Sequence, residues 1–85
     1  MPELALPDSS PLTLAERISF YYTASLENVA NINTLVAQET RTEVETNRLR
    51  RDVEHLELML AKDWWTDQDL APLQAAVAAG RPLLS

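Results

Sequence analysis

The longest uninterrupted stretch of this chain, from Leu12 to Ala71, contains neither glycine nor proline. Prolines lie just outside it, at Pro11 and Pro72. Within the stretch, apolar residues recur at intervals of three and four residues, which is the spacing of one helix face. Since glycine and proline are the residues that most often interrupt or end a helix, the sequence predicts an all-α protein.

The expected helix starts are marked by capping patterns. Thr13 is followed three residues later by Glu16, the spacing of a capping box, so we expect a long amphipathic helix over about residues 13–63. Thr66 precedes acidic residues that complement a helix dipole, which predicts a short C-terminal helix over about residues 67–79.

Proline and glycine complicate the C-terminal helix. Pro72 would stand well inside a helix that begins at residue 67, where it is unfavourable, and the alternative is that the helix restarts there. Gly80 and Pro82 are expected to end the helix. The chain is thus expected to be one helical domain, with an extended arm over residues 1–11, a long helix or hairpin over 12–63, and a short helix and tail over 64–85.

Two paths of the chain are compatible with residues 38–48, because this interval is polar yet contains neither glycine nor proline. A strict heptad register places apolar residues before and after the interval on one seam. We therefore favour a continuous helix that pairs with other copies of the chain. The alternative is a fold-back near residue 40.

A fold-back would form a hairpin whose two apolar faces match. It would pair Ile32 with Leu49 and Val29 with Val53. The second helix would begin at one of two capping boxes, Thr40 with Glu43 or Thr42 with Glu45.

The apolar faces of these helices are broader than one helix neighbour covers. The arc is wide over residues 14–36, and residues 49–60 form a seam of their own. Because a chain of 85 residues builds only a marginal core, we expect an obligate homo-oligomer or a stable complex with a larger protein, centred on the 49–60 seam. The residues expected at this interface are Ile18, Tyr22, Val29, Ile32, Leu49, Val53, Leu56, Leu60, Trp64 and Trp65.

Aromatic residues occur as a triplet, Phe20-Tyr21-Tyr22, and as a pair, Trp64-Trp65. The triplet points around about half of a helix, so one ring is expected at an edge or an interface. We expect ordinary core packing with one hydroxyl in water. The tryptophan pair is expected to divide between packing in the core and capping the helix turn. The alternative is that they anchor a partner, because tryptophan is frequent among the residues that dominate binding.

The only histidine, His55, follows Asp52 by one helical turn. In di-iron helical bundles the corresponding element is Glu-x-x-His completed by a carboxylate of a facing helix, which Glu27 would supply in a fold-back. The chain has Asp in place of Glu and no second His, so we expect a surface histidine beside an acid and no metal site. No catalytic signature is present in the sequence, and we expect no catalytic residue, no cofactor and no enzymatic activity.

Charge and composition narrow the partners. Thirteen acidic residues against seven basic ones give a net charge of −6, which argues against direct nucleic-acid binding because phosphate contacts need a cationic face. No apolar run approaches the ~20 residues that span a membrane. The chain has no cysteine, which fits the cytoplasm or, if the chain is phage-encoded, a virion.

These features favour an interaction protein over an enzyme. We expect a non-enzymatic helical assembly protein with a structural, scaffold or adaptor role, of the general kind of the small helical accessory proteins of bacteria and phages. The alternative function is an acidic inhibitor that occupies a nucleic-acid-binding surface of another protein, because an acidic chain competes with phosphate for a basic surface.

Overall fold

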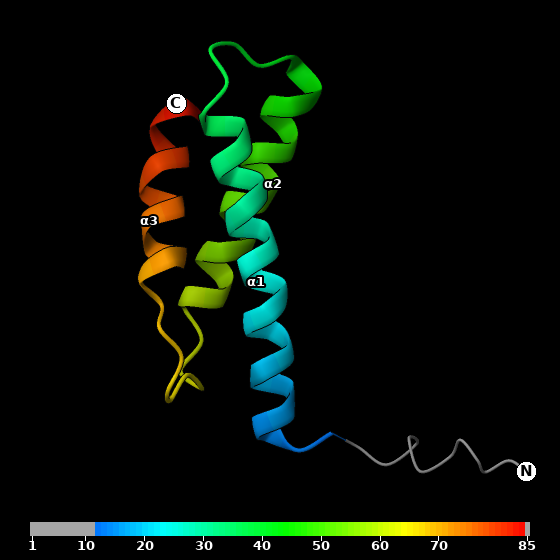
Figure 1. The fold of residues 1–85 in the computed structure, drawn as a ribbon, viewed down its shortest axis with the longest axis vertical. Helices are drawn as coiled ribbons and strands as arrows, with labels where there is room; N and C mark the ends of the chain where they lie inside the picture. The colour runs from blue at the N-terminus through cyan, green and yellow to red at the C-terminus, as the bar shows by residue number, and fades with distance from the viewer. Residues whose placement is uncertain (1–11, 85) are drawn as a thin grey trace, which may run out of the picture.

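The fold is a three-helix arrangement, seen in a computed structural model that describes residues 12–84. Helix α1 spans Leu14–Val36, α2 spans Glu43–Leu60 and α3 spans Ala71–Gly80, followed directly by a 3-10 helix over Arg81–Leu84. The helices run alternately up, down and up, with α3 beside both others (Figure 1). Residues 12–84 contain no strand, and the all-α prediction is confirmed. The predicted arm over residues 1–11 lies outside the described residues.

The expected continuous helix through residues 38–48 is wrong, and the fold-back is what the structure shows. Helix α1 begins at the predicted capping box, in which Thr13 and Glu16 bond reciprocally. Helix α2 begins at the second such box: the Glu45 amide donates to Thr42 Oγ1 at 3.1 Å, and the Thr42 amide donates to Glu45 Oε1 at 2.9 Å. The chain therefore turns between two ordinary helix ends.

The turn contains no glycine, and an arginine within it donates to one carbonyl of the last turn of α1 and to one carbonyl of the turn itself. Arg41 Nη1 donates to the carbonyl of Leu35 at 3.0 Å and to that of Gln38 at 2.9 Å. The last carbonyls of a helix have no partner within it, and a left-handed glycine is only one way of supplying one. No residue in 12–84 has a positive φ angle.

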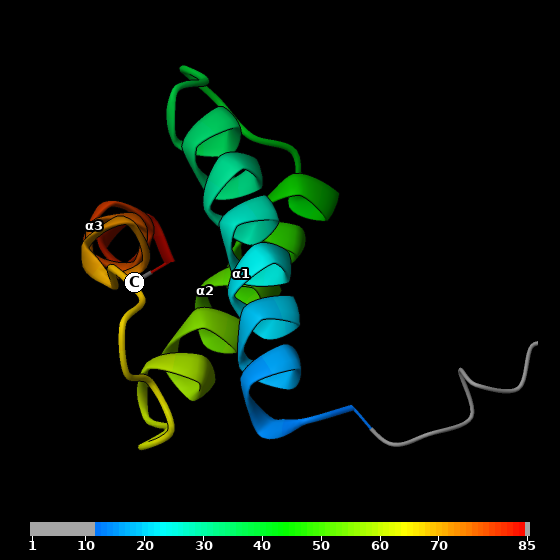
Figure 2. The same cartoon turned by 60° about the horizontal axis from the view of Figure 1, so that its bottom comes forward.

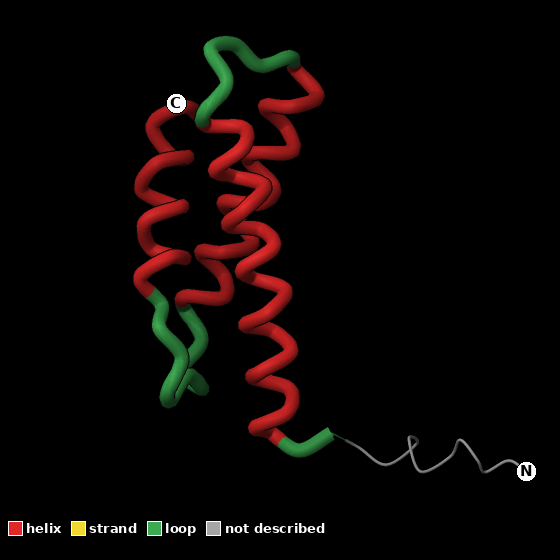
Figure 3. Tube along the Cα trace, viewed as in Figure 1, coloured by secondary structure: helices red, strands yellow, loops and turns green. Residues whose placement is uncertain are grey.

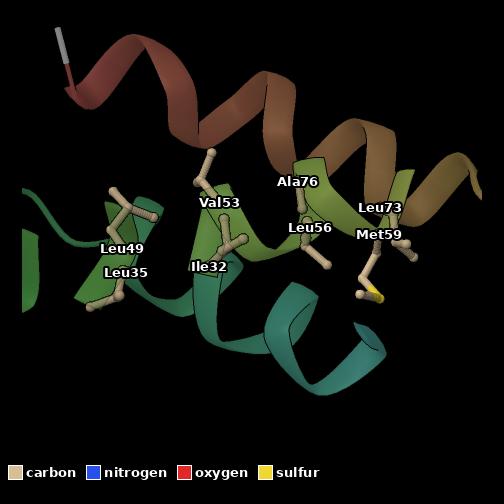
Figure 4. Packing of buried hydrophobic residues seen from close by; sticks show 8 residues of the cluster. All are labelled: Ile32, Leu35, Leu49, Val53, Leu56, Met59, Leu73 and Ala76. Atoms are coloured by element: carbon tan, nitrogen blue, oxygen red, sulfur yellow. The ribbon is translucent and has the colours of Figure 1, made fainter. Parts of the chain in front are cut away.

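The core forms where the three helices pack against one another. Leu49, Val53 and Leu56 of α2 are fully buried there, so the 49–60 seam, which we expected at the centre of an interface with another chain, packs within the same chain. The short α3 is sufficient to cover it. Figure 4 shows the buried apolar side chains of all three helices gathered together, namely Ile32, Leu35, Leu49, Val53, Leu56, Met59, Leu73 and Ala76.

Helix α3 begins four residues later than the predicted start at residue 67. Proline lacks the amide hydrogen of an interior helix residue and its ring clashes with the preceding turn, so Pro72 fits only in the first turn of α3. The alternative of a restart at the proline is therefore correct. The Ala71 amide donates to Asp69 Oδ1 at 3.0 Å, which supplies one of the bonds that a helix start needs.

Helix α3 ends at Gly80, as expected, and a 3-10 helix follows it without a break. The role of Gly80 is close packing. A Cβ atom at this position would lie 2.8 Å from Val53 Cγ2 and 3.4 Å from Leu49 Cδ1. Only glycine allows the end of α3 to approach α2 this closely.

None of the helices within residues 12–84 combines the length and the apolar character needed to cross a membrane.

Candidate functional site

The one Phe, two Tyr and two Trp residues of the chain form a single cluster where α1 passes the end of α2. Tyr21 stacks on Trp64 with ring centroids 5.2 Å apart and planes 4° apart. Phe20 meets Tyr21 edge to face at 6.1 Å, and Trp65 meets Trp64 edge to face at 5.8 Å. Tyr22 lies 6.2 Å from Trp65. We call these five residues the aromatic cluster.

The hairpin path brings the cluster together. Because α1 and α2 are antiparallel, the first half of α1 runs beside the connection over residues 61–70, which Figure 3 shows as the lower loop. Figure 2, from a second viewpoint, again places this connection and the start of α1 at the same end of the molecule. Tyr21 and Tyr22 of α1 thus meet the two tryptophans of the connection, and Phe20 joins the cluster through Tyr21.

Two members of the cluster are fixed by hydrogen bonds. Trp65 Nε1 donates to the carbonyl of Met59 near the end of α2 at 2.8 Å, and this carbonyl also accepts the backbone amide of Lys62 at 3.1 Å. The Tyr22 hydroxyl donates to the carbonyl of Asp69 at 2.6 Å. Both residues also pack against the core. Trp65 and Tyr22 therefore hold the connection in place.

Trp64 is held differently. Its Nε1 is buried and has no acceptor among residues 12–84. The ring is contacted by the neighbouring rings and by the ammonium group of Lys62, whose Nζ lies 5.5 Å from the ring centroid. Apolar packing against the core, ring contacts and a cation–π contact hold this side chain, with no hydrogen bond from its Nε1 to any residue in 12–84.

The outer part of this end is apolar and accessible. Phe20 is 65% exposed and Tyr21 is 37% exposed. Leu14 is 61% exposed, although it continues the α1 seam on which Ile18 is buried, because α1 extends past the last turn of α2 (Figure 1). Exposed rings that cluster are uncommon on a small protein without a binding role. We call the exposed residues Leu12, Leu14, Phe20 and Tyr21, together with Trp64, the aromatic end.

Charged residues border the aromatic end. Four exposed carboxylates and two exposed cations lie close in the sequence to its residues, so the net charge of the border is negative. These residues are Glu16 and Arg17 of α1 and Lys62, Asp63, Asp67 and Asp69 of the connection.

A second feature is a recess between α1 and α2, lined by Asn28, Arg51, Asp52 and His55. Burial raises the pKa of the Asp52 carboxyl, against the opposing effect of nearby Arg48, Arg51 and His55. Oδ2 of Asp52 is buried without a hydrogen-bond partner among the described residues.

The recess does not contain the carboxylate that a metal site would need. Glu27 was expected to face Asp52 and His55, but Asn28 lines the recess in its place and Glu27 is exposed. Across residues 12–84, no group of three His, Asp or Glu side chains lies close enough together to hold a metal ion.

The ten residues expected at an interface fall into two groups. Five are buried within the chain and have almost no surface for a partner: Ile18, Ile32, Leu49, Val53 and Leu56. Five are half-buried and pack against the core: Tyr22, Val29, Leu60, Trp64 and Trp65. Of these, Trp64 belongs to the aromatic end, and the structure brings it together with residues that were not expected there.

The residues missed by the sequence analysis are the exposed ones. Leu14 was assigned to the apolar face of the first helix, and one ring of the aromatic triplet was expected at an edge without being identified; Leu14 and Phe20 are both mostly exposed. The signal was present in the Phe20-Tyr21-Tyr22 triplet, since three consecutive helical positions cannot all face one core. The ring left outside is that of Phe20, whereas a tyrosine hydroxyl had been expected in water.

Comparison with known proteins gives no match: no family model, no curated protein and no solved structure matches the chain. The function is therefore inferred from the arrangement of the chain's own residues.

Proposed function

We propose that this chain is a non-enzymatic helical interaction protein, with a structural, scaffold or adaptor role, that docks onto another protein through its aromatic end. The observation that carries the proposal is the exposure of Phe20 beside the Tyr21–Trp64 stack. Aromatic side chains bury large areas with little loss of side-chain freedom, and they dominate the energetics of many interfaces.

The division of labour within the aromatic cluster supports this role. Trp65 and Tyr22 fix the scaffold by hydrogen bonds, whereas Phe20 and Trp64 make none. A rigid base that presents accessible rings is suited to binding, because little order has to be imposed when a partner arrives.

The partner is a larger protein or a second copy of the chain. A core already closed within one chain removes the need for an obligate oligomer, so the docking is expected to join folded molecules. The lack of cysteine fits a complex in the cytoplasm, or in a virion if the chain is phage-encoded.

Site-specific photocrosslinking tests the proposal. A photoreactive phenylalanine is placed at Phe20 in the cells from which the chain comes, and a matched one is placed at Val44, which is similarly exposed at the other end of α2. We expect one defined crosslinked protein, identified by mass spectrometry, from position 20 and not from position 44. Identical products at both positions, or none at position 20, would contradict the proposal.

The acidic border favours a second candidate, namely an inhibitor that covers a nucleic-acid-binding surface of its partner. If the protein crosslinked at Phe20 binds nucleic acid, the chain and the nucleic acid should compete for it. Simultaneous binding of both would exclude the inhibitor role while leaving the docking role intact.

A further inference from the structure

We infer that the occupant of the aromatic end is a basic segment of another protein, in which lysine or arginine side chains alternate with aliphatic ones. This inference rests on the proposed docking role and adds the chemistry of the partner. It combines the accessible rings with the carboxylates that border them.

The carboxylates decide the sign of the partner's charge. Asp63 and Asp67 flank the tryptophan pair, both are exposed, and neither has a hydrogen bond or ion pair with any residue in 12–84. Asp69, by contrast, already receives the amide of Ala71. Two carboxylates without partners beside an apolar surface are complementary to a cationic chain, and such complementarity both steers and selects a partner.

The tryptophan ring shows that this surface accepts a cation. Lys62 Nζ lies 5.5 Å from the centroid of the Trp64 ring, within the range of a cation–π interaction. The exposed ring of Phe20 offers a similar face that no cation of the described residues occupies in a ring contact. A partner's lysine or arginine would therefore find both a carboxylate and a ring within one site.

The apolar rim requires that the partner carry aliphatic side chains as well. Leu12 and Leu14 are more than half exposed at the start of α1. A purely cationic chain would leave these leucines in water, whereas an alternating segment covers them. Each covered leucine adds to the binding free energy through burial of its apolar area.

The same charges act against a second copy as the occupant. Each copy would bring four carboxylates and two cations to the contact, and the whole chain carries a net charge of −6. Like charges across an interface oppose association, most strongly at low salt. The carboxylates that attract a basic segment thus disfavour self-association through the aromatic end.

Titration of the full chain with three short synthetic peptides, followed by amide NMR, tests the inference. The peptides share one leucine pattern and differ only in their polar positions, which are all Lys, all Gln or all Glu. We expect the Lys peptide to shift amides of residues 12–24 and 61–70, and to bind about tenfold more tightly than the Gln peptide. The Glu peptide should bind most weakly, and a higher salt concentration should reduce the differences in affinity among the three peptides.

Paired variants separate this site from general attraction to an acidic protein. Replacing Asp63 and Asp67 with Asn should weaken the binding of the Lys peptide roughly fivefold to tenfold, as expected for the loss of two exposed ion pairs. Replacing Glu39 and Glu43 with Gln removes two exposed carboxylates from the opposite end and should leave binding unchanged. Phe20→Ala should weaken all binding at the site about tenfold, whereas Val44→Ala should not.

The outcomes distinguish the docking role of the aromatic end from its preference for a basic partner. If the Gln peptide binds the aromatic end as tightly as the Lys peptide, the docking surface stands and its preference for a basic partner is wrong. If no peptide shifts residues 12–24 and 61–70, both are wrong. If dilution of the free chain shifts these same amides, the occupant is a second copy and the basic segment is excluded.

Discussion

Gly80 lies so close to Val53 that a Cβ atom on the glycine would stand 2.8 Å from Val53 Cγ2. In an ordinary helix, replacing glycine with alanine stabilises by roughly 0.5–1 kcal/mol. Here the added methyl group meets a fully buried side chain, so Gly80→Ala should instead destabilise by about 1–3 kcal/mol. Chemical denaturation of the two proteins measures the difference.

The control for Gly80→Ala is the same change in a Val53→Ala background. Removing the isopropyl group makes room for the new methyl, so the two changes together should cost less free energy of unfolding than the sum of the single changes. If Gly80→Ala is stabilising, or if the two changes are additive, the close approach is not what requires glycine here.

Thr42 begins α2, and its capping box determines where the chain folds back. Thr42→Ala removes the acceptor for the Glu45 amide and should lower the free energy of unfolding by about 1 kcal/mol. Thr40, exposed and without a hydrogen bond to any residue in 12–84, is the matched control, and Thr40→Ala should change stability by no more than about 0.5 kcal/mol. A larger loss of stability from Thr40→Ala would indicate that α2 begins at the Thr40–Glu43 capping box instead.

Loss of the indole N–H should lower the stability of the protein at Trp65 but not at the adjacent Trp64. Trp65→Phe removes the side-chain donor to the Met59 carbonyl, which keeps the Lys62 amide as its other donor, and should destabilise by about 1 kcal/mol. Trp64→Phe removes a buried donor that has no acceptor, so the change should lie within about 0.5 kcal/mol of neutral. Thermal melts of the two variants compare them directly, and equal losses would show that the hydrogen bond does not distinguish these positions.

Asp52 should make the chain less stable near neutral pH. Burial raises the pKa of its carboxyl in the folded state, so folding favours the protonated form. The favourable contribution of the neutral form is complete below the ordinary pKa and is lost as the pH rises through the folded pKa. Asp52→Asn should therefore be more stable than the parent at neutral pH, and the difference should vanish by about pH 3.

Comparison with Asp52→Asn is needed because another carboxyl acts in the opposite direction. The Thr42 amide, as the leading cause, lowers the pKa of Glu45, so Glu45 loses its stabilising contribution as the pH falls. The parent and the variant share Glu45, and its effect cancels between them. A difference that grows toward low pH would contradict the assignment to Asp52.

Local chemistry identified the starts of α1 and α2 more directly than the end of α1, whereas the start of α3 was predicted four residues too early. The boxes at Thr13 and Thr42 require only residues three apart, which the sequence displays directly. The end of α1 depends on Arg41 reaching back to the carbonyls of Leu35 and Gln38. A search for glycine finds no such stop, and this is why a continuous helix was expected through the turn.

Long-range relationships set the rest of the fold and most of the candidate site. Gly80 could be read only as a helix end, because its contact with Val53 exists only after α3 has docked on α2. The Tyr21–Trp64 stack likewise depends on the fold-back. Helical periodicity identified the apolar residues correctly, but it could not tell which of them the short α3 would cover and which, such as Leu14, would stay exposed.

The two hydrogen bonds of Asp69 predict which helices should separate first when the structure unfolds locally. Its carbonyl receives the Tyr22 hydroxyl from α1, while its carboxylate receives the first amide of α3. A displacement of α1 that breaks the tyrosine bond therefore also loosens the start of α3. Amides of α3 should then exchange with solvent together with those of the connection and ahead of the buried turns of α2, so the C-terminal third detaches as one unit while the α1–α2 hairpin persists.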